Sequence, residues 1–350
     1  MNGGRGVHMT KVLVTGGAGF IGGNFIHHMI EKYPSYKIYN LDSLTYAGDL
    51  IKHEKFQSYS NYTFCKLDIN DRKAVTELFF KEQFDFVVHF AAESHVDRSI
   101  LDPGIFVQTN VLGTQILLEA AKAVSVQKFV HVSTDEVYGD LPFEPNLYFT
   151  EETPLQPNSP YSASKASSDL MVRAYHETYQ LPVNITRCSN NYGPYHFPEK
   201  LIPLAITRVM EGQKVPVYGA GSNIRDWLHV QDHCAAVDLV LHEGAAGEVY
   251  NIGGHNEKSN LEVVKTIINM LGSNNDLIEF VEDRLGHDRR YAIDPSKIEA
   301  LGWKPRHSFE SGIAETIQWY QQNQLWWQRI LSGEYRQYFE RQYSFDQVNG

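Results

Sequence analysis

The sequence predicts an α/β fold, a Rossmann-like doubly wound parallel sheet followed by a smaller mixed α/β part. Short β-branched and aromatic runs alternate with longer helical ones from Lys11 onward, which is the pattern of consecutive βαβ units. A glycine-rich turn joins the first such run to a helix, and the alternation weakens after about residue 190. A chain of 350 residues has room for about two domains, which we place at residues 11–190 and 191–343, with chain crossovers allowed between them.

The individual elements follow from local signals. Strands are expected at residues 11–15, 37–41, 62–66, 85–90, 128–132 and 182–187. Two long helices should start at Asp102 and Ser159, because each is a capping residue followed by proline at the first helical position. Later helices are expected at residues 199–211, 232–241, 260–271 and 309–322. Asp232 should cap the second of these, and the aromatic tail around Trp326 and Trp327 should pack against helices.

Charge and cysteine content limit the partners and the compartment. The net charge is −11, so no broad basic face is expected to bind a nucleic-acid polymer or an anionic membrane. No apolar run reaches the length of a membrane span, and residues 1–10 contain no apolar signal segment. The three cysteines form no metal or disulfide pattern, which favours a cytoplasmic protein. Met9 is consistent with an original start behind an expression leader of residues 1–8.

The glycine-rich turn after the first strand indicates a dinucleotide site. Residues 15–22 read Thr-Gly-Gly-Ala-Gly-Phe-Ile-Gly and continue into a helix. Glycines allow backbone N–H groups to approach a pyrophosphate, and a helix N-terminus stabilises its charge. The residues expected to contact the cofactor in this turn are Gly16, Gly19, Phe20, Ile21 and Gly22.

Asp42 selects the cofactor. It follows the second strand about 20 residues after Gly22, where a carboxylate accepts hydrogen bonds from a ribose. A 2′-phosphate about 4 Å away would be repelled by up to ~4 kcal/mol, and residues 43–50 contain no Arg or Lys to relieve this. The sequence therefore predicts NAD over NADP, with Ser43 beside the same ribose.

Tyr161 and Lys165 form a second constellation. They are four residues apart in the helix expected to start at Ser159, so both lie on one helix face. An adjacent ammonium, a cationic nicotinamide and a helix N-terminus each favour the phenolate. Tyr161 is therefore predicted to act as a base near neutral pH.

With these motifs in place, the chain resembles the extended short-chain dehydrogenase/reductase family from Lys11 to about Tyr343. The glycine turn, Asp42, Tyr161 and Lys165 carry the resemblance. It implies that Lys165 also holds the nicotinamide ribose. It further implies that four more residues lie along the cofactor, namely Asp68 and Ile69 at the adenine and Ala91 and Ala92 along its path.

The segment Thr134-Asp135-Glu136 narrows the activity. A 4-epimerase needs only Tyr, Lys and a hydroxyl, whereas removing water across carbons 5 and 6 of a sugar also needs a base and an acid. Asp135 and Glu136 provide such a pair at the carboxyl end of the fifth strand, where sheets of this class present catalytic groups. A structural role for both acids, in capping or in a salt bridge, is the alternative.

Three further segments extend the resemblance to the dTDP-glucose 4,6-dehydratases: residues 91–99, residues 190–194 and Arg225-Asp226-Trp227. It implies that Thr109 and Asn191 face the cofactor. The substrate contacts that it implies are Ser94, Thr134, Asn190, Lys200, Leu201, Pro216, Val217, Tyr218, Arg225, Asn260, Arg284 and His287. Arg225 is chemically suited to bind a diphosphate, and Leu285 stands where the family usually has proline.

The resemblance implies an internal redox cycle that uses NAD and dTDP-glucose and forms a 4-keto-6-deoxy sugar nucleotide, usually a rhamnose precursor. Tyr161 and Thr134 would act at the 4-hydroxyl, Glu136 at carbon 5 and Asp135 at the hydroxyl on carbon 6. UDP-glucose 4,6-dehydratase, a related epimerase and a non-catalytic NAD sensor are the alternatives. GDP-mannose dehydratases and UDP-glucuronate decarboxylases tend to carry serine in place of Asp135.

No metal is expected, and a homodimer is. His229 and His233 have helical ligand spacing but lack the glutamate that follows the first histidine in zinc proteases. The helices that start at Asp102 and Ser159 resemble the pair that forms a four-helix dimer interface in this family.

Overall fold

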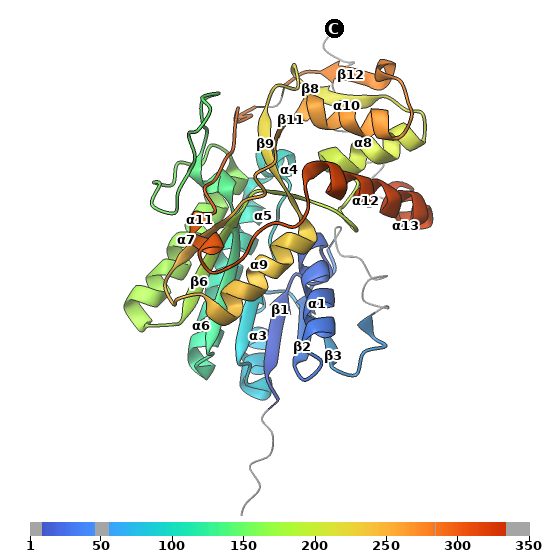
Figure 1. Ribbon diagram of the computed structural model, residues 1–350. Coiled ribbons are helices and arrows are strands. Elements are labelled where there is room, and N and C mark those ends of the chain that lie inside the picture. Colours follow the sequence, from blue (N-terminus) through green and yellow to red (C-terminus); the bar gives the residue numbers. More distant parts are fainter. Residues whose placement is uncertain (1–8, 46–55, 284, 334–350) are drawn as a thin grey trace, which may run out of the picture.

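The computed structural model describes residues 9–45, 56–283 and 285–333. Its largest element is a seven-stranded sheet with the order β10-β6-β5-β4-β1-β2-β3, in which every pairing is parallel (Figure 1). The strands are β1 (Lys11–Thr15), β2 (Lys37–Asp42), β3 (Tyr62–Lys66), β4 (Phe86–His89), β5 (Lys128–Thr134), β6 (Val183–Cys188) and β10 (Val249–Ile252). The predicted doubly wound sheet is confirmed, and the order in which the strands are added reverses between β1 and β4, the position at which such sheets bind ligands.

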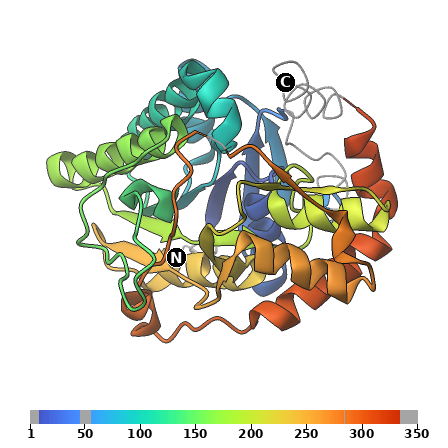
Figure 2. The same ribbon diagram turned by 90° about the horizontal axis from the view of Figure 1, so that it is seen from above.

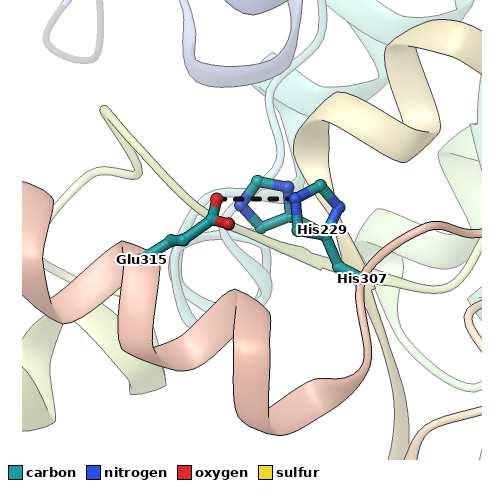
Figure 3. A group of neighbouring side chains, drawn as sticks. All are labelled: His229, His307 and Glu315. Atoms are coloured by element: carbon teal, nitrogen blue, oxygen red, sulfur yellow. Dashed lines mark ion pairs between the residues drawn. The ribbon is translucent and has the colours of Figure 1, made fainter.

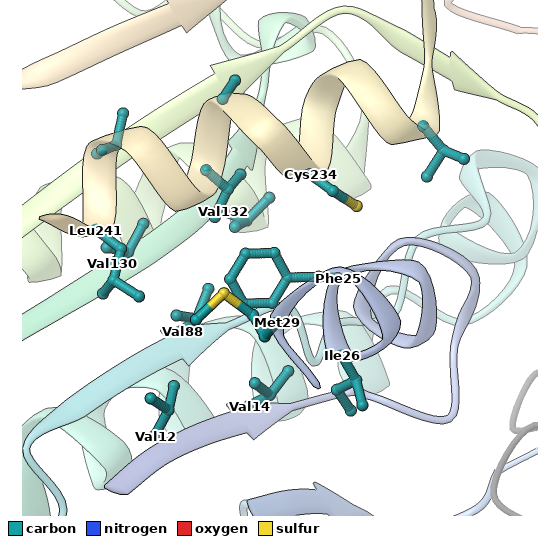
Figure 4. Packing of buried hydrophobic residues seen from close by; sticks show 14 of the residues in the cluster. Val12, Val14, Phe25, Ile26, Met29, Val88, Val130, Val132, Cys234 and Leu241 are labelled. Carbon is teal, nitrogen blue, oxygen red and sulfur yellow. The ribbon is translucent and has the colours of Figure 1, made fainter. Parts of the chain in front are cut away.

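Alternate side chains of the strands build two cores. Val12 and Val14 of β1 pack with α1 (Phe20–Lys32) and α9 (Val230–Glu243) on one face of the sheet (Figure 4). Leu13 points to the other face, as the two-residue period of a strand requires. That face is covered by α3 (Arg72–Glu82), α6 (Thr114–Val124) and α7 (Pro160–Tyr179).

The two proline-marked helix starts form as predicted. Ser159 caps α7 with a reciprocal capping box to Ser162. After the short α4 (Val96–Leu101), Asp102 precedes α5 (Pro103–Phe106), although its side chain makes no capping hydrogen bond. The helical backbone then continues through a π-helical segment, η1 (Val107–Gly113), into α6. A 3₁₀ turn, η2 (Asp135–Tyr138), follows β5.

A smaller part of the chain, here called the small lobe, stands above the carboxyl edge of the large sheet (Figures 1 and 2). It has one sheet of three strands and one of two, with a core of its own. Its strands are β7 (Asn190–Tyr192), β8 (Val215–Tyr218), β9 (Ile224–His229), β11 (Glu257–Ser259) and β12 (Ile278–Val281). Its helices are α8 (Leu201–Met210), α10 (Asn260–Met270), η3 (Asn275–Leu277), α12 (Phe309–Gln322) and α13 (Gln324–Leu331).

The chain crosses between the two parts. After β9 it returns through α9 and β10 to the large sheet, where β10 pairs with β6, before β11 re-enters the small lobe. A short helix, α11 (Ser296–Glu299), lies against β10. No helix of the described part of the chain is both long and apolar enough for a membrane span.

The later helices differ from the prediction at Asp232 and agree with it at the aromatic tail. Asp232 is not the N-cap of α9, because the helix begins at Val230 after His229. Asp232 lies in the first turn, where its carboxylate accepts a hydrogen bond from the backbone N–H of His307 at 3.0 Å. Trp326 and Trp327 are buried in the core of the small lobe, as the prediction of helix packing requires.

Candidate active site

A pocket of about 470 Å³ opens at the carboxyl edge of the large sheet, within the size range of ligand sites. It brings together most of the residues that the sequence singled out. Those from the large-sheet half are Gly16, Gly19, Phe20, Ile21, Gly22, Asp42, Ser43, Asp68, Ile69, Ala91, Ala92, Ser94, Thr109, Thr134, Glu136, Tyr161 and Lys165. Asn190, Asn191, Lys200 and Leu201 line it from the side of the small lobe.

The glycine turn leaves no room for side chains. Gly16 has φ +74°, and a Cβ there would lie 2.6 Å from the backbone nitrogen of Ala91. A Cβ on Gly22 would lie 2.3 Å from the carbonyl oxygen of Gly16. Helix α1 begins here with no acidic residue in its first turn and no side-chain cap, so its N-terminus suits a phosphate. The turn therefore fits the pyrophosphate of a dinucleotide.

Asp42 is anchored beside this turn. One carboxylate oxygen accepts a hydrogen bond from the N–H of Ala18 at 3.0 Å, and the other accepts one from the N–H of Leu44 at 2.8 Å. These bonds hold a negative charge at the end of β2, next to the glycine turn. A carboxylate oxygen can accept more than one hydrogen bond, so the arrangement leaves capacity for a ribose hydroxyl.

Tyr161 and Lys165 lie in the first turns of α7 and are both buried. The Lys165 ammonium donates to the carbonyl oxygen of Val132 at 2.8 Å, which fixes it against β5. Burial lowers the pKa of Lys165 to about 8. Burial and the nearby Glu136 charge raise the pKa of Tyr161 well above 10. The sequence predicted the opposite direction for Tyr161, because it counted the neighbouring cation but not the loss of water around a phenol.

Asp135 and Glu136 are neighbours in the chain with different surroundings. Glu136 lines the pocket, whereas Asp135 does not and is 1% exposed. Burial first, and then the charge of Glu136, raise the pKa of Asp135 well above its usual value. One Asp135 oxygen accepts from the Thr134 hydroxyl at 3.3 Å, and the other has no hydrogen-bond partner among the described residues. The site thus places an acid whose raised pKa favours its protonated form beside a second carboxyl group at the pocket wall.

Several expected substrate residues lie apart from this pocket, on β8, β9, α10 and the loop after β12. Arg225 is 5% exposed, and its guanidinium donates to the carbonyl oxygen of Asp288 at 2.9 Å and lies 4.2 Å from the ring centre of Tyr291. Tyr218 donates to Asp97 at 3.4 Å, and His287 lies 2.6 Å from Asp283. The members of this set are Pro216, Val217, Tyr218, Arg225, Asn260 and His287. Arg284 falls outside the described residues, and Leu285 is exposed.

The pocket also contains residues that sequence reasoning missed. His196 stacks on Phe20 at 4.2 Å between ring centres, and Glu199 is a carboxylate whose side chain is only 4% exposed. Cys188, at the end of β6, and Trp326, from α13, complete the wall. Cys188 could have been found, because it ends a parallel strand at the ligand-binding edge. Trp326 could not, since no local pattern brings a helix near the end of the chain to this pocket.

One missed residue supports the loop after β4. The side-chain amide of Asn110, in the π-helical segment, accepts from the N–H of Glu93 and donates to its carbonyl, both at 2.9 Å. It also donates to the Ser164 hydroxyl at 2.8 Å. π-helical turns often occur at functional sites, and this one ties the pocket loop to α7.

Comparisons with known proteins agree with the geometry. The family model described as GDP-mannose 4,6 dehydratase matches residues 13–316. A dTDP-glucose 4,6-dehydratase of Neisseria meningitidis is 52% identical over 349 residues, covering 94% of this chain and 98% of that protein. The crystal structure of a dTDP-glucose 4,6-dehydratase from Bacillus anthracis with NAD has a TM-score of 0.86 and 52% identity, covering 92% of this chain and 99% of that one.

A second solved structure, from Streptomyces venezuelae, is a dTDP-glucose 4,6-dehydratase with NAD and TYD bound. Its TM-score is 0.88 at 48% identity, and the match covers 92% of this chain and 100% of that chain. Identity near one half over almost the full length of each relative is far above what a shared fold alone would require. The chain therefore belongs to the dTDP-glucose 4,6-dehydratase family, within the broader group described by the GDP-mannose 4,6 dehydratase model.

Proposed function

We infer that the protein is an NAD-dependent dTDP-glucose 4,6-dehydratase, which forms dTDP-4-keto-6-deoxyglucose and water. The observation that carries this function is the meeting of two sets at one sheet edge, Thr134-Asp135-Glu136 after β5 and Tyr161 with Lys165 on α7. An epimerase needs only the second set and a hydroxyl. The first set adds the acid and the base that an elimination requires.

The residues that would hold NAD follow from the pocket. We propose that the glycine turn and the N-terminus of α1 bind the pyrophosphate, that Asp42 with Ser43 binds the adenosine ribose, and that Lys165 binds the nicotinamide ribose. Bound NAD supplies a hydride acceptor at carbon 4 of the sugar and later a hydride donor at carbon 6, so it is regenerated in each cycle. Asp42 disfavours a 2′-phosphate through charge repulsion.

Tyr161 and Thr134 are proposed to act at the 4-hydroxyl. Tyr161 takes the hydroxyl proton while carbon 4 is oxidised, and the Thr134 hydroxyl holds the same sugar oxygen by a hydrogen bond. Burial raises the pKa of Tyr161, so the phenol needs a positive charge beside it to ionise. Lys165, fixed one helical turn away, would provide part of that charge.

The two acids are proposed to divide the elimination between them. Glu136, at the pocket wall, takes the proton from carbon 5, which the ketone at carbon 4 has made acidic. Asp135, which lies behind the pocket wall with its carboxyl group against the Thr134 hydroxyl, is proposed to give a proton to the hydroxyl that leaves carbon 6, and burial raises its pKa, which favours the protonated form. The proton held by Glu136 returns to carbon 5 when carbon 6 is reduced.

We also propose that the two parts of the chain bind different ligands. Residues 11–190 would mainly bind NAD and residues 191–343 mainly the nucleotide sugar, with α9 and β10 crossing back to the large sheet. Lys200 already links the two, since its ammonium donates to the carbonyl of Ser94 at 3.1 Å. Arg225 is proposed to bind the diphosphate of the substrate. His287 and Tyr218 are proposed to contact the nucleotide sugar from the side of the small lobe.

A homodimer in the cytoplasm is the proposed state of the protein. Exposed apolar side chains gather on the two helices that the sequence assigned to a dimer interface, notably Ile105, Val107 and Leu112 on one and Leu170 on the other. Leu170 is 58% exposed and Val107 is 57% exposed. Pairing these helices with those of a second copy would bury this surface.

A direct competition between dTDP-glucose and UDP-glucose tests the substrate. The purified enzyme is given each nucleotide sugar alone and then both together, and the 4-keto product is measured. We expect a higher kcat/KM for dTDP-glucose. Equal or better turnover of UDP-glucose would reassign the substrate while leaving the reaction type intact, and 4-epimerised product from either sugar would overturn the reaction type.

A further inference from the structure

A cluster of potential metal ligands lies outside the pocket, where β9 meets α9 and α12. His229 ends β9, His307 lies in the loop before α12, and Glu315 projects from α12 toward them (Figure 3). One donor atom from each of the three lies within 4.8 Å of the others. None of the three lines the pocket, and the function proposed above does not use them.

The burial of the His229 ring is not explained by its hydrogen bonds. It is 2% exposed, and neither ring nitrogen has a hydrogen-bond partner in the part of the chain that the structure describes. A neutral imidazole has one N–H donor and one lone pair, and leaving both unpaired in the interior is costly. The ring lies against His307, with 4.0 Å between ring centres, and edge-on to Tyr192.

His307 has the carboxylate partner that metal-binding histidines usually have, although its ring would have to turn off that of His229 for both to face one ion. Its Nδ1 lies 2.9 Å from a carboxylate oxygen of Asp232, while its Nε2 points to Glu315 at 3.4 Å. Donation from Nδ1–H to Asp232 leaves the Nε2 lone pair facing Glu315 and the His229 ring. In zinc sites, a ligating histidine usually donates the N–H of its other ring nitrogen to a carboxylate.

We propose that His229, His307 and Glu315 bind one Zn²⁺ ion, with a water molecule as the fourth ligand. Two imidazoles and a carboxylate form a donor set that zinc accepts at about 2.0–2.2 Å. The separations of up to 4.8 Å would have to shorten to about 3.4 Å around such an ion. The Glu315 side chain is 56% exposed, so it is free to move inward.

The competing interpretation is a charged stack without metal. Pairing of His307 with both Asp232 and Glu315, while its ring lies on that of His229, explains the contacts of His307. It leaves both nitrogens of His229 unpaired, whereas a metal ion gives one of them a partner. The metal interpretation therefore accounts for one more buried group than the alternative does.

The ion would have a structural role. His229 immediately precedes α9, and His233 lies one turn further along that helix. The Nδ1 of His233 lies 2.9 Å from the amide oxygen of Asn191, which lines the pocket. Binding would cross-link this helix start to α12 and so stiffen the support of the pocket. We expect zinc to raise the melting temperature without changing turnover per bound NAD.

The test uses metal-free full-length protein and measures binding of Zn²⁺ by equilibrium dialysis and of Co²⁺ by its visible absorption. We expect one equivalent of Zn²⁺ and the strong absorption of a four-coordinate Co²⁺ site. Glu315→Gln, a change at an exposed side chain, and His307→Gln should each weaken binding at least about tenfold. Asp232→Asn should weaken it about 10- to 100-fold.

His255→Gln is the matched control, because His255 also pairs with a glutamate, Glu299, at 2.8 Å but on the surface. It should leave binding unchanged. The proposal is overturned if the parent protein binds well under one equivalent, or if Glu315→Gln and His307→Gln bind zinc as tightly as His255→Gln does. NAD content and melting temperature of each variant show that it is folded.

Discussion

Side chains of the large sheet reach the pocket directly from the ends of their strands, whereas several expected substrate residues of the small lobe do not line it and pair with other groups of the protein. Asp42, Thr134 and Cys188 each end a parallel strand and line the pocket. Arg225, Tyr218 and His287 instead contact Asp288, Asp97 and Asp283. This difference supports our proposal that chemistry and cofactor binding belong mainly to one region and recognition of the sugar nucleotide mainly to the other. Variants of the two regions should therefore affect different kinetic constants.

The largest effect is expected from Glu136 in the large-sheet half. Glu136→Gln keeps the approximate shape of the side chain and leaves Tyr161, Thr134 and Lys165 in place. Exchange of the carbon 5 hydrogen with deuterated water should slow about 10²- to 10⁴-fold, while enzyme-bound NADH still forms in a single turnover. Mass spectrometry and absorbance at the NADH band measure the two steps.

Asp135→Asn is the matched variant for that experiment. It should slow water loss while exchange at carbon 5 persists, because the lost proton donor serves the leaving hydroxyl. Full elimination activity with normal exchange in Glu136→Gln would remove Glu136 from the mechanism.

The contact between α1 and α9 should show the next largest effect, on stability. Asp238 of α9, 1% exposed, lies 2.7 Å from His28 and 2.6 Å from Lys32 of α1. Burial raises the pKa of Asp238, but hydrogen bonds with His242, His28 and Lys32 outweigh it and hold that pKa far below its usual value. Asp238→Asn should lower the free energy of unfolding by about 2 kcal/mol, less than for a fully buried pair because Lys32 is half exposed.

The pH dependence of this contact has a definite sign. Because the pKa of Asp238 is depressed in the folded state, its carboxylate stabilises the fold above pH ~4, and this stabilisation is lost as the pH falls. His242, whose pKa the hydrogen bond with Asp238 raises, stabilises below pH ~6.5 and loses its effect as pH rises through the raised value. The free energy of unfolding in urea should be measured at several pH values. In Asp238→Asn it should vary less with pH in both the acidic and the near-neutral range. An unchanged pH dependence would contradict the assignment.

A smaller effect is expected on the choice of cofactor. Asp42→Ala should bring the affinity for NADP about tenfold closer to that for NAD, because it removes the charge that repels a 2′-phosphate. Asp42→Asn separates charge from anchoring, since its amide oxygen can still accept from one of the two backbone N–H groups. Fluorescence titration with both cofactors measures this. Equal affinity of the parent protein for NAD and NADP would refute the role of Asp42.

The smallest effect is expected in the small lobe. Tyr218→Phe removes the hydroxyl that reaches Asp97 across the two regions. The KM for dTDP-glucose should rise about fivefold, as for one lost hydrogen bond, with kcat nearly unchanged. Steady-state kinetics at saturating NAD give both constants. A fall in kcat without a change in KM would erase the distinction between the two regions.

Local sequence signals were sufficient for six of the seven strands of the large sheet. The glycine turn and the two proline-marked helix starts are each specified by a few consecutive residues and lie where the sequence placed them, whereas β5 runs two residues further than predicted, to Thr134. Long-range contacts were not predictable in the same way. The pairing of β10 with β6 and the approach of Trp326 to the pocket depend on how the whole chain packs.

The pKa values and ionic partners of buried groups could also not be predicted from the sequence. The sequence paired Tyr161 with a cation and predicted a depressed pKa, but burial and the Glu136 charge dominate. Likewise, Asp232 reads as a helix cap and instead accepts hydrogen bonds from His307. In both cases the missing information was how much water the fold removes and which distant group it brings near.

The internal redox cycle is tested most directly by following one hydrogen. dTDP-glucose carrying deuterium at carbon 4 is mixed with dTDP-glucose that is fully ¹³C-labelled but undeuterated, and the product is analysed by NMR and mass spectrometry. We expect deuterium at carbon 6 only in the ¹²C product, with no accumulation of free NADH. Deuterium lost to solvent, deuterium in the ¹³C product, or stoichiometric NADH would contradict the cycle.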